Sequence, residues 1–507
     1  MTMKIAVLDP AIAPAAIGVI GAGVMGAGIA QIAAQAGHEV WLLDARAGAA
    51  AAAIAKTGDQ LAALVAKGRM TAEVRDAVLT RLHAAEHIDA LAGCALVIEA
   101  IVELAEPKQA LLRELDGLLG DEALVATNTS SISVTLLANG MRRPERLVGM
   151  HFFNPVPLMK LVEVVSGAET APAAAEAVEQ LARRWGKTPV RTRSTPGFIV
   201  NRIARPYYAE TLALMQEQAA VPAVLDRALR GAGFRMGPCE LMDLIGHDTN
   251  ALVTRSVFEA NFGDRRYQPS MVQQALVDGG RLGRKVGRGI YDGGPPPVES
   301  VAPPTEALPD VQLVGAGPLI DGLDRWLTTR RLAFARAEGD WLGLRIANVE
   351  VHLTSGRSAA ELAHLRGTPA LAVMDWPVAP ERASEGPGLA LAFAPHCDVT
   401  ARAPVETIWR ALGWAPLELR DVPGLAVART VAMLVNEAAD AVWQGVCTPE
   451  AADAAMKLGV NYPQGPFEWL AQLGAPALVG LLDALFEAYR SERYRVSPLL
   501  RRRLWGG

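Results

Sequence analysis

The segment His151-Phe152-Phe153-Asn154-Pro155-Val156-Pro157 holds the best acid-base candidates in the sequence. Residues before proline avoid the helical conformation, so His151 is expected on a turn, and Leu161–Val165 is expected to form a strand. Glu163 lies inside that apolar strand, where a carboxylate needs a charged or hydrogen-bonding partner. His151 is the nearest candidate, and a histidine held by a carboxylate can act as a general base.

A glycine-rich turn lies near the start of the chain. Residues 16–20 predict a strand, which is followed by Gly21-Ala22-Gly23-Val24-Met25-Gly26 and an alanine-rich helix to about Ala36. In such a turn the glycines permit a tight bend, close approach of a pyrophosphate and close helix-strand packing. The next predicted strand, residues 40–43, ends at Asp44, which could bind the adenosine ribose and would repel a 2′-phosphate. NAD is therefore favoured over NADP, with Gly21, Gly23, Met25 and Gly26 as contacts.

Two further predicted strands end in polar clusters. Residues 95–98 run into Glu99–Glu103, and residues 123–126 run into Thr127–Ser131. Ligands bind at the carboxyl ends of strands in doubly wound sheets, so Glu103, Asn128 and Ser130 are expected where cofactor and substrate meet. Any single Ser or Thr here could instead cap the following helix. Residues 47–83, which precede these two strands, read as helical, and their lysines, including Lys56 and Lys67, are ordinarily solvated.

Composition fits a soluble enzyme. About half of the 507 residues are apolar and the formal net charge is −5, which gives no general attraction to nucleic acid or to an acidic membrane. The 20 residues 11–30 carry no charge, but their five glycines argue against a membrane span or a leader, so the cytoplasm is expected. The cysteines form no CxxC pattern, which favours a reducing compartment and predicts no metal site: Cys94, Cys239, Cys397 and Cys447.

The chain changes from α/β to all-α after about residue 192 and then repeats itself. Pro423–Arg429 parallels Pro196–Arg202, which indicates duplication. In the copy, Ile320 stands at the third glycine position, Pro318 is expected to interrupt the helix start, and Ala428 replaces the counterpart of Asn201, so the copy is expected to bind no dinucleotide. The expected parts are a Rossmann-like NAD-binding domain 14–192, a helical domain 193–292, a Pro/Gly linker 293–309, a degenerate Rossmann-like insert 310–420 and a second helical copy 421–507.

Five motifs together resemble the L-3-hydroxyacyl-CoA dehydrogenase family. They are the glycine turn, Glu99–Glu103, Asn128–Ser131, His151–Pro155 and Pro196–Arg202, and the resemblance covers residues 14–292 and 421–507. The duplicated helical half is similar to the long bacterial form, which acts on 3-hydroxybutyryl-CoA or on the 3-hydroxyadipyl-CoA of phenylacetate degradation. The resemblance implies reversible oxidation of an (S)-3-hydroxyacyl-CoA with NAD.

The resemblance also assigns roles to individual residues. His151 matches the catalytic base and Glu163 the carboxylate that orients it. Ser130 and Asn201 match the groups that bind the substrate 3-oxygen, and Asn154 lies beside them. Further matches are the cofactor contacts Asp44, Glu103 and Lys108, and Lys67, which matches a lysine that meets the CoA phosphates; Ala63 stands where some members carry a second lysine.

Several alternatives stay open at this point. A non-enzymatic NAD-binding member of the family is one, and the short-chain 3-hydroxybutyryl-CoA substrate is another. A terminal carboxylate on the acyl group could be bound by Arg205, Arg235 or Arg255, although surface solvation is the ordinary role of each. The partner is an acyl-CoA; the duplicated helical domains are expected to pair within the chain, with a homodimer of whole chains left open.

Overall fold

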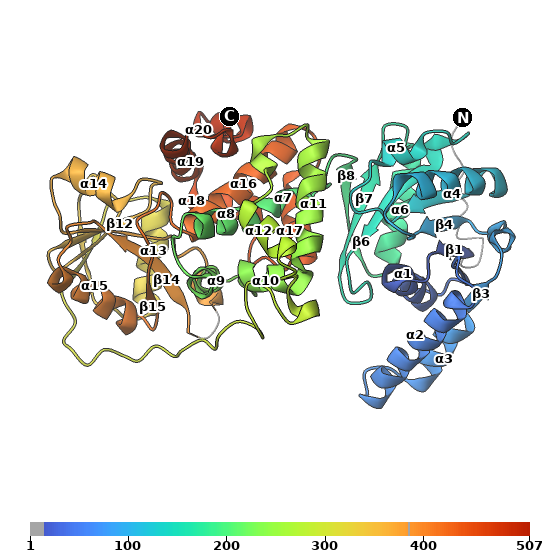
Figure 1. The fold of residues 1–507 in the computed structure, drawn as a ribbon, viewed down its shortest axis with the longest axis horizontal. Helices are drawn as coiled ribbons and strands as arrows, with labels where there is room; N and C mark the ends of the chain where they lie inside the picture. Colours follow the sequence, from blue (N-terminus) through green and yellow to red (C-terminus); the bar gives the residue numbers. More distant parts are fainter. Residues whose placement is uncertain (1–14, 384–385, 507) are drawn as a thin grey trace. The chain divides into compact units, whose positions relative to one another are not determined.

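The computed structural model describes residues 15–383 and 386–506, which divide into two compact units (Figure 1). The first unit runs to Asn201 and also contains Gly445–Val460; the second comprises residues 202–444 and those from Asn461 onward. Among the described residues no single helix is long and apolar enough to cross a membrane, although one bent helix pair, Pro466–Leu473 with Ala475–Tyr489, reaches that length and composition together.

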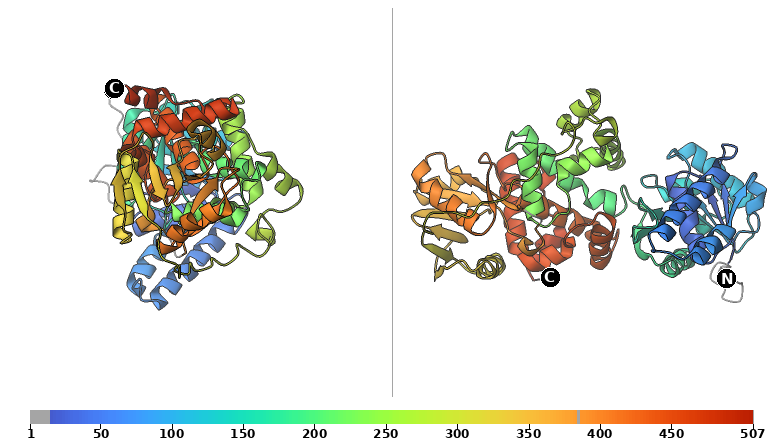
Figure 2. Two further views of the ribbon diagram at one scale, coloured as in Figure 1. Left: turned by 90° about the vertical axis from the view of Figure 1, so that its left-hand side faces the viewer. Right: turned by 90° about the horizontal axis from the view of Figure 1, so that it is seen from below.

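The first unit is built on an eight-stranded sheet in the order β3-β2-β1-β4-β5-β6-β7-β8. Its sheet and covering helices are the blue to teal ribbon of Figure 2. All neighbouring strands are parallel except β6 and β7, which form an antiparallel hairpin. The expected Rossmann-like α/β architecture is therefore confirmed. The strands are β1 (Ile17–Ile20), β2 (Val40–Leu43), β3 (Leu82–Ala85), β4 (Leu96–Glu99), β5 (Leu124–Thr127), β6 (Leu147–Phe152), β7 (Leu161–Ser166) and β8 (Thr188–Arg193).

Helices cover both faces of this sheet. One apolar cluster joins the sheet to α1, α2, α3 and α6, and a second cluster joins its other face to α4 and α5. Because both faces are covered, the central strands β1, β4 and β5 are buried along their whole length. The helices are α1 (Val24–Gln35), α2 (Ala49–Ala66), α3 (Ala72–Thr80), α4 (Ala105–Leu118), α5 (Val134–Ala138) and α6 (Pro172–Arg184).

The helical expectation for residues 47–83 was wrong at its end. Helix α3 stops at Thr80, and Leu82–Ala85 forms the edge strand β3, paired in parallel with Val40–Leu43. No glycine or proline lies between Thr80 and Ala85 to mark the change, so the local sequence continues the helical pattern. Pairing with a strand that lies far away in the sequence overrides that weak local preference.

The second unit contains the remaining helices and a second sheet. Its strand order is β10-β9-β11-β12-β13-β14-β15, with parallel and antiparallel pairs mixed. The strands are β9 (Val311–Val314), β10 (Ala335–Ala337), β11 (Gly343–Ile346), β12 (Val349–Leu353), β13 (Leu371–Met374), β14 (Gly388–Phe393) and β15 (Ala415–Glu418). The helices are α8 (Arg205–Gln216), α9 (Pro222–Gly231), α10 (Pro238–Ile245), α11 (His247–Ala260), α12 (Met271–Asp278), α13 (Pro318–Thr329), α14 (Ala359–Arg366), α15 (Val399–Ala411), α16 (Val427–Trp443), α18 (Pro466–Leu473), α19 (Ala475–Tyr489) and α20 (Pro498–Leu504).

The turn after β9 differs from the glycine turn of the first unit. Pro318 does not interrupt a helix, as expected from the sequence, but occupies the first turn of α13, where its missing N–H costs nothing. Ile320 is fully buried in the position of the third glycine. A bulky core side chain therefore fills the place where the first unit keeps its turn and helix in close contact.

The turns that start the two helical copies have the same conformation. Gly197 and Gly424 both have φ of 77°, and the residues that follow, Phe198 and Leu425, also have positive φ. Each turn is held by a buried acid from the preceding sheet region: Glu163 accepts hydrogen bonds from the first copy, and Asp375 accepts from Ala426, Val427 and Ala428. The structure of these turns supports duplication of the helical part.

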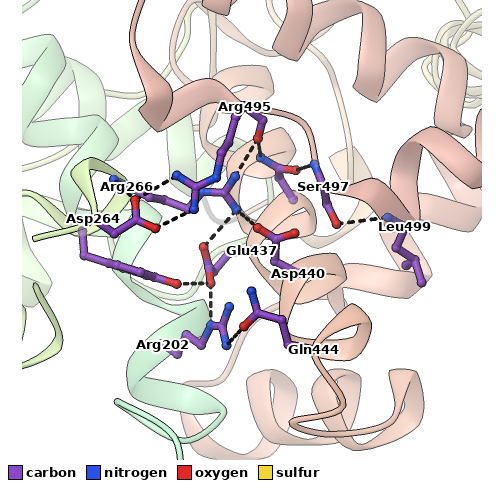
Figure 3. Close-up of polar contacts among 11 residues, drawn as sticks. Arg202, Asp264, Arg266, Glu437, Asp440, Gln444, Arg495, Ser497 and Leu499 are labelled. Atoms are coloured by element: carbon purple, nitrogen blue, oxygen red, sulfur yellow. Dashed lines mark hydrogen bonds and ion pairs between the residues drawn. The ribbon is translucent and has the colours of Figure 1, made fainter. Parts of the chain in front are cut away.

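Reciprocal ion pairs join the two helical copies within the second unit. Arg202 Nε donates to Glu437 Oε1 on α16 at 2.6 Å, and Arg429 Nε donates to Glu210 Oε2 on α8 at 2.7 Å. Figure 3 shows Glu437 between Arg202 and Arg266, and Arg266 Nη2 donates in turn to the Arg495 carbonyl oxygen. All four partners in the two pairs are buried, so the copies meet through charges that solvent does not screen.

One helix of the second copy belongs to the first unit. Helix α17 (Pro449–Gly459) packs against β7 and β8, and the carbonyl of Val446 accepts from the N–H of Arg193. The corresponding helix of the first copy, α9, packs against β14 of the second sheet. Each sheet thus receives a helix from the other repeat.

Candidate active site

His151 and Glu163 form a buried hydrogen-bonded pair across the β6-β7 hairpin. The two residues are direct partners in the antiparallel register, and His151 Nδ1 lies 2.6 Å from Glu163 Oε2. His151 is 6% exposed and Glu163 is fully buried. Because the carboxylate accepts at Nδ1, the other ring nitrogen, Nε2, is left to exchange a proton with a ligand. His151 lies in strand β6, not on the turn expected from the sequence, because pairing with β7 extends the strand to Phe152.

The second oxygen of Glu163 holds the start of the helical region. Glu163 Oε1 accepts hydrogen bonds from the N–H groups of Ile199 and Val200 at 3.0 and 2.9 Å. These residues lead into α7 (Val200–Ile203), which carries Asn201. Three hydrogen bonds therefore satisfy a carboxylate that would be costly to bury alone, and the same carboxylate fixes the base and the helix that presents Asn201.

Ser130 and Asn201 lie together within the first unit. Asn201 Nδ2 donates to the Ser130 carbonyl at 3.3 Å, and Ser130 is held by Glu103, whose Oε1 accepts from the Ser130 N–H at 2.8 Å. Glu103 also accepts from Thr129 Oγ1 at 2.7 Å. Burial opposes ionisation of Glu103, but Lys108 and these hydrogen bonds keep its pKa below the usual value. An ionised acid thus organises the loop after β5.

Lys108 lies beneath this loop and is buried. Its ammonium contacts Glu99 at 2.5 Å and Glu103 at 3.2 Å, so its charge is taken up by the two acids that follow β4. Asn128 has a similar supporting position, because its Oδ1 accepts from the Phe152 N–H at 2.9 Å and fastens the end of β6 to the end of β5. Asn128 stands at a predicted strand end, whereas Lys108 lies in helix α4.

The glycine turn has the geometry of a dinucleotide-binding site. Gly21 has φ of 104°, and a Cβ at Gly26 would lie 1.7 Å from the Gly21 carbonyl oxygen, so only glycine fits there. A Cβ at Gly23 would meet nothing within 4 Å, which leaves open space at the N-terminus of α1, where no side chain caps the helix. Free N–H groups beside open space fit the pyrophosphate of NAD. Met25 lies in the first turn of the same helix.

Asp44 follows β2 and closes this turn. Its Oδ2 accepts from the Ala22 N–H at 2.8 Å, and its Oδ1 accepts from Arg46 Nε at 3.1 Å. The hydrogen bond from Arg46 is the main reason that the pKa of Asp44 falls to about 2. The residue is therefore a carboxylate at neutral pH, which suits ribose hydroxyls and disfavours a 2′-phosphate.

A cavity of about 550 Å³ lies next to the turn and the loop after β6. Asn154 is exposed on this loop and lines the cavity. Arg46 and Lys56 also line it, and neither was predicted as a site residue. For Lys56 the reason is that lysines on an alanine-rich helix are usually solvated. The spacing of Lys56 and Lys67 on α2 was the available signal, since it places both on one helix face. Lys67 itself ends α2, is exposed and is absent from the cavity lining.

Among the residues that the structure describes, no group of three or more His, Cys, Asp or Glu side chains is arranged to hold a metal ion. The first unit contains the buried His151-Glu163 pair, a polar cluster around Ser130, and a glycine turn with an ionised acid. A dinucleotide-binding fold with a general base at the carboxyl ends of its strands defines an NAD-dependent oxidoreductase.

Comparison with known proteins gives the family. The family description "3-hydroxyacyl-CoA dehydrogenase, NAD binding domain" matches residues 16–195, and "3-hydroxyacyl-CoA dehydrogenase, C-terminal domain" matches 197–293 and 424–505. A "3-hydroxybutyryl-CoA dehydrogenase reduced Rossmann-fold domain" matches 351–423. The chain therefore belongs to the 3-hydroxyacyl-CoA dehydrogenase family and catalyses NAD-dependent oxidation of 3-hydroxyacyl-CoA.

Individual relatives cover either the whole chain or its first half. The 3-hydroxyadipyl-CoA dehydrogenase of Escherichia coli (strain K12) is 44% identical over 94% of this chain and 94% of its own length. The 3-hydroxybutyryl-CoA dehydrogenase of Bradyrhizobium diazoefficiens is 43% identical over 54% of this chain and 94% of its own. A crystal structure of 3-hydroxybutyryl-CoA dehydrogenase from Escherichia coli K12 aligns with a TM-score of 0.87 at 42% identity, covering 97% of this chain and 98% of that chain.

Proposed function

We propose that the substrate is a 3-hydroxyacyl-CoA whose acyl group ends in a carboxylate, as in 3-hydroxyadipyl-CoA, and that the reaction is its reversible oxidation to the 3-oxoacyl-CoA. The observation that carries this proposal is the similarity along nearly the whole chain to a relative named for that substrate. The short-chain 3-hydroxybutyryl-CoA is the second candidate, favoured by the name of the similar crystal structure.

His151 is assigned as the base. Its free Nε2 takes the proton of the 3-hydroxyl group, while Glu163 keeps the ring in the required tautomer and stabilises the imidazolium that forms. Bound NAD supplies the hydride acceptor. Ser130 and Asn201 are assigned to the 3-oxygen, because both lie on elements that Glu103 and Glu163 hold in place. A base positioned in this way contributes about 10²–10⁴-fold to the rate.

Cofactor and CoA contacts follow from the cavity beside the glycine turn. Gly21, Gly23, Met25, Gly26 and Asp44 are assigned to NAD, with Glu103, Lys108 and Asn128 supporting the nicotinamide side. Asn154 and Lys56 line the same cavity, so we assign them to the acyl-CoA. Lys67 lies outside that lining and stays a prediction for the CoA phosphates.

Arg205 is the candidate for the terminal carboxylate. It begins α8, directly after the helix that carries Asn201, and lines a cavity of about 200 Å³ inside the second unit. Its side chain is buried, donates to Thr254 Oγ1 at 3.1 Å and stacks on Tyr208 at 4.9 Å. The hydroxyl and amide groups of Thr254, Ser270 and Gln273 complete a polar lining that suits a carboxylate. Arg235 and Arg255, the other candidates from the sequence, are exposed.

Substrate comparison tests the proposal. Arg205→Met should lower kcat/KM for 3-hydroxyadipyl-CoA by about 10- to 100-fold, the value of a hydrogen bond to a charged group, and should change that for 3-hydroxybutyryl-CoA much less. Arg235→Met, at an exposed position in the same helical region, is the matched control. Equal values for the two substrates in all three proteins would refute a carboxylate site at Arg205 and favour the short-chain substrate.

The duplicated helices are assigned a structural role. We infer that their pairing through Glu210 and Glu437 covers within one chain an apolar face that a single copy would have to cover by association. Removal of residues 310–507 should therefore yield dimers or aggregates in light scattering, and a monodisperse monomer would refute this role. The four free cysteines support a reducing compartment, and hence the cytoplasm, as the location.

A further inference from the structure

Lys187 is a buried lysine that reaches the loop of the catalytic hairpin. It lies between α6 and β8, where its own N–H donates to the Ala182 carbonyl, and its side chain leaves the residue 8% exposed. Its ammonium donates to the carbonyl oxygens of Val156 at 2.5 Å and of Met159 at 2.8 Å. One side chain thus bonds two main-chain groups of a single loop.

That loop, residues 153–160, joins the strand of His151 to the strand of Glu163. Pro155 and Pro157 give it no N–H groups at two positions, and the N–H groups of Leu158 and Met159 both donate to the Pro155 carbonyl at 3.0 Å. The loop therefore makes a compact turn of its own, and Lys187 is the side chain that ties the carbonyls of this turn to the body of the unit.

A second contact, with helix α1, also holds the loop. The Val156 side chain is 2% exposed and packs against Gly28 of α1, where a Cβ would lie 2.8 Å from Val156 Cβ. The stretch from Asn154 to Pro157 forms part of the wall of the 550 Å³ cavity beside the glycine turn. A shift of the loop would consequently move the cavity wall and Asn154 together.

The charge at Lys187 is not explained by an ion pair. Its hydrogen-bond acceptors are carbonyls, and the other charged side chains that line the hollow beside it, Lys160 and Arg184, are also cations. Burial, with a smaller contribution from Lys160, lowers the pKa of Lys187 to about 8. Carbonyls that accept from an ammonium are held more firmly than carbonyls that accept from a neutral group. The charge of Lys187 therefore strengthens its hold on the loop, which offsets the electrostatic cost of burial.

We propose that Lys187 is a positioning residue for the dehydrogenation: its two hydrogen bonds fix loop 153–160, and through it Asn154 and the spacing of the strands that carry His151 and Glu163. The inference rests on the proposed roles of those residues. Lys187 lies outside the strand ends and, in this assignment, acts through loop 153–160 and not on the reacting atoms.

The first test compares Lys187→Met with Lys160→Met, a matched change at an exposed lysine of the same loop. With acetoacetyl-CoA and NADH, Lys187→Met should lower kcat by at least about tenfold, since small displacements at a reacting centre cost that much, while KM for NADH stays within about twofold. Hydrogen exchange at the amides of Leu158 and Met159 should accelerate in Lys187→Met alone. Unchanged kcat together with unchanged exchange would overturn the proposal.

Chemical rescue separates position from folding. Lys187→Cys treated with 2-bromoethylamine restores an ammonium at the length of lysine, and turnover should return with it; treated wild-type protein controls for the native cysteines. In wild type, kcat for oxidation of the 3-hydroxyacyl-CoA with NAD, the direction in which His151 has to be neutral, should fall as pH rises past about 8 and the ammonium is lost. The limb should disappear in Lys187→Met and move to lower pH in the rescued protein, because the thioether lowers the basicity of the amine.

These tests distinguish failure of the positioning role of Lys187 from failure of the residue roles on which it rests. Failure of the rescue in a folded protein, or an alkaline limb that persists in Lys187→Met, would refute the positioning role while wild-type turnover stands. A wild type inactive with every 3-oxoacyl-CoA would refute the proposed residue roles instead, and the exchange measurement would still decide whether Lys187 orders the loop.

Discussion

Glu163 acts on two partners with its two oxygens. One oxygen lies 2.6 Å from His151 Nδ1, and the other accepts the N–H groups of Ile199 and Val200. The base and the start of the helix that carries Asn201 are therefore set by a single buried carboxylate. A change at this residue should affect the tautomer of the base as well as the placement of Asn201.

Glu163→Gln tests the tautomer directly. Its carbonyl oxygen would face the two amides, so its NH₂ group would face Nδ1 and force the ring hydrogen onto Nε2, which could then accept no proton. We expect kcat to fall by about 10²–10⁴-fold, close to the loss in His151→Ala, with NADH binding retained in both. Steady-state rates and fluorescence titration measure these quantities. More than a tenth of wild-type kcat in Glu163→Gln would contradict the dyad.

Asp44 should determine the choice between NAD and NADP. Its carboxylate is ionised because Arg46 and the Ala22 N–H stabilise the charge. Asp44→Ala removes the repulsion of a 2′-phosphate and frees Arg46 to meet it, so the ratio of kcat/KM values for NAD and NADP should drop by at least about tenfold, or 1.4 kcal/mol. Asp59→Ala, at an exposed acid of α2, is the control. An unchanged ratio would show that Asp44 does not discriminate.

At the scale of elements, the two repeats keep one device for starting a helix. Asp375 in the second sheet accepts from Ala426, Val427 and Ala428, as Glu163 accepts from its own turn. Both oxygens of Asp375 are engaged with main-chain N–H groups, and its side chain is one methylene shorter than that of Glu163. The second repeat therefore retains an acid that binds the N–H groups at the start of its helix, but neither oxygen of that acid contacts an imidazole.

The ion pairs between α8 and α16 should carry measurable stability. Arg429 and Glu210 are buried, so Arg429→Met leaves a buried carboxylate short of its partner and should cost about 3–5 kcal/mol in the unfolding of the second unit. Arg410→Met, in a surface pair with Glu406, should cost about 0.3–0.5 kcal/mol. Urea unfolding compares the two. A loss in Arg429→Met no larger than that in Arg410→Met would contradict the explanation.

On the scale of the whole molecule, the repeats exchange helices between sheets. Helix α17 of the second copy lies against β7, the strand of Glu163, and α9 of the first copy lies against β14. Gly459 on α17 permits the close approach, because a Cβ there would lie 2.7 Å from Leu161 Cδ2 and 3.1 Å from Val200 Cγ2. The second half of the chain thus supports the catalytic strand although it carries none of the assigned catalytic residues.

Gly459→Val should disturb the active site from the second repeat. The added methyl groups would press on Leu161 at the start of β7, so we expect a kcat at least about tenfold lower, the effect of a small displacement at the dyad. Gly480→Val is the matched control, because a Cβ at that helical glycine meets nothing within 4 Å. Equal rates in the two variants would show that α17 does not influence the site.

The sequence by itself determined the glycine turn, Asp44 and the order of the catalytic groups. These features depend on short-range geometry: Gly21, Gly23 and Gly26 fit one bend, and Asp44 follows the next strand at a fixed interval. Glu163 was also predictable, because an acid in an apolar strand requires a partner nearby. His151 was expected as its partner because it is the nearest candidate, and the antiparallel register that places the two opposite each other was seen only in the structure.

Only the tertiary structure decided which elements support that chemistry. Strand β3, the strand position of His151, the two carbonyl contacts of Lys187 and the packing of α17 on β7 all depend on residues far apart in the sequence. No local pattern encodes such contacts, because their free energy comes from pairing and burial that exist only after the chain has folded. The short motifs therefore identify the reaction, and the packing of distant segments fixes where its groups stand.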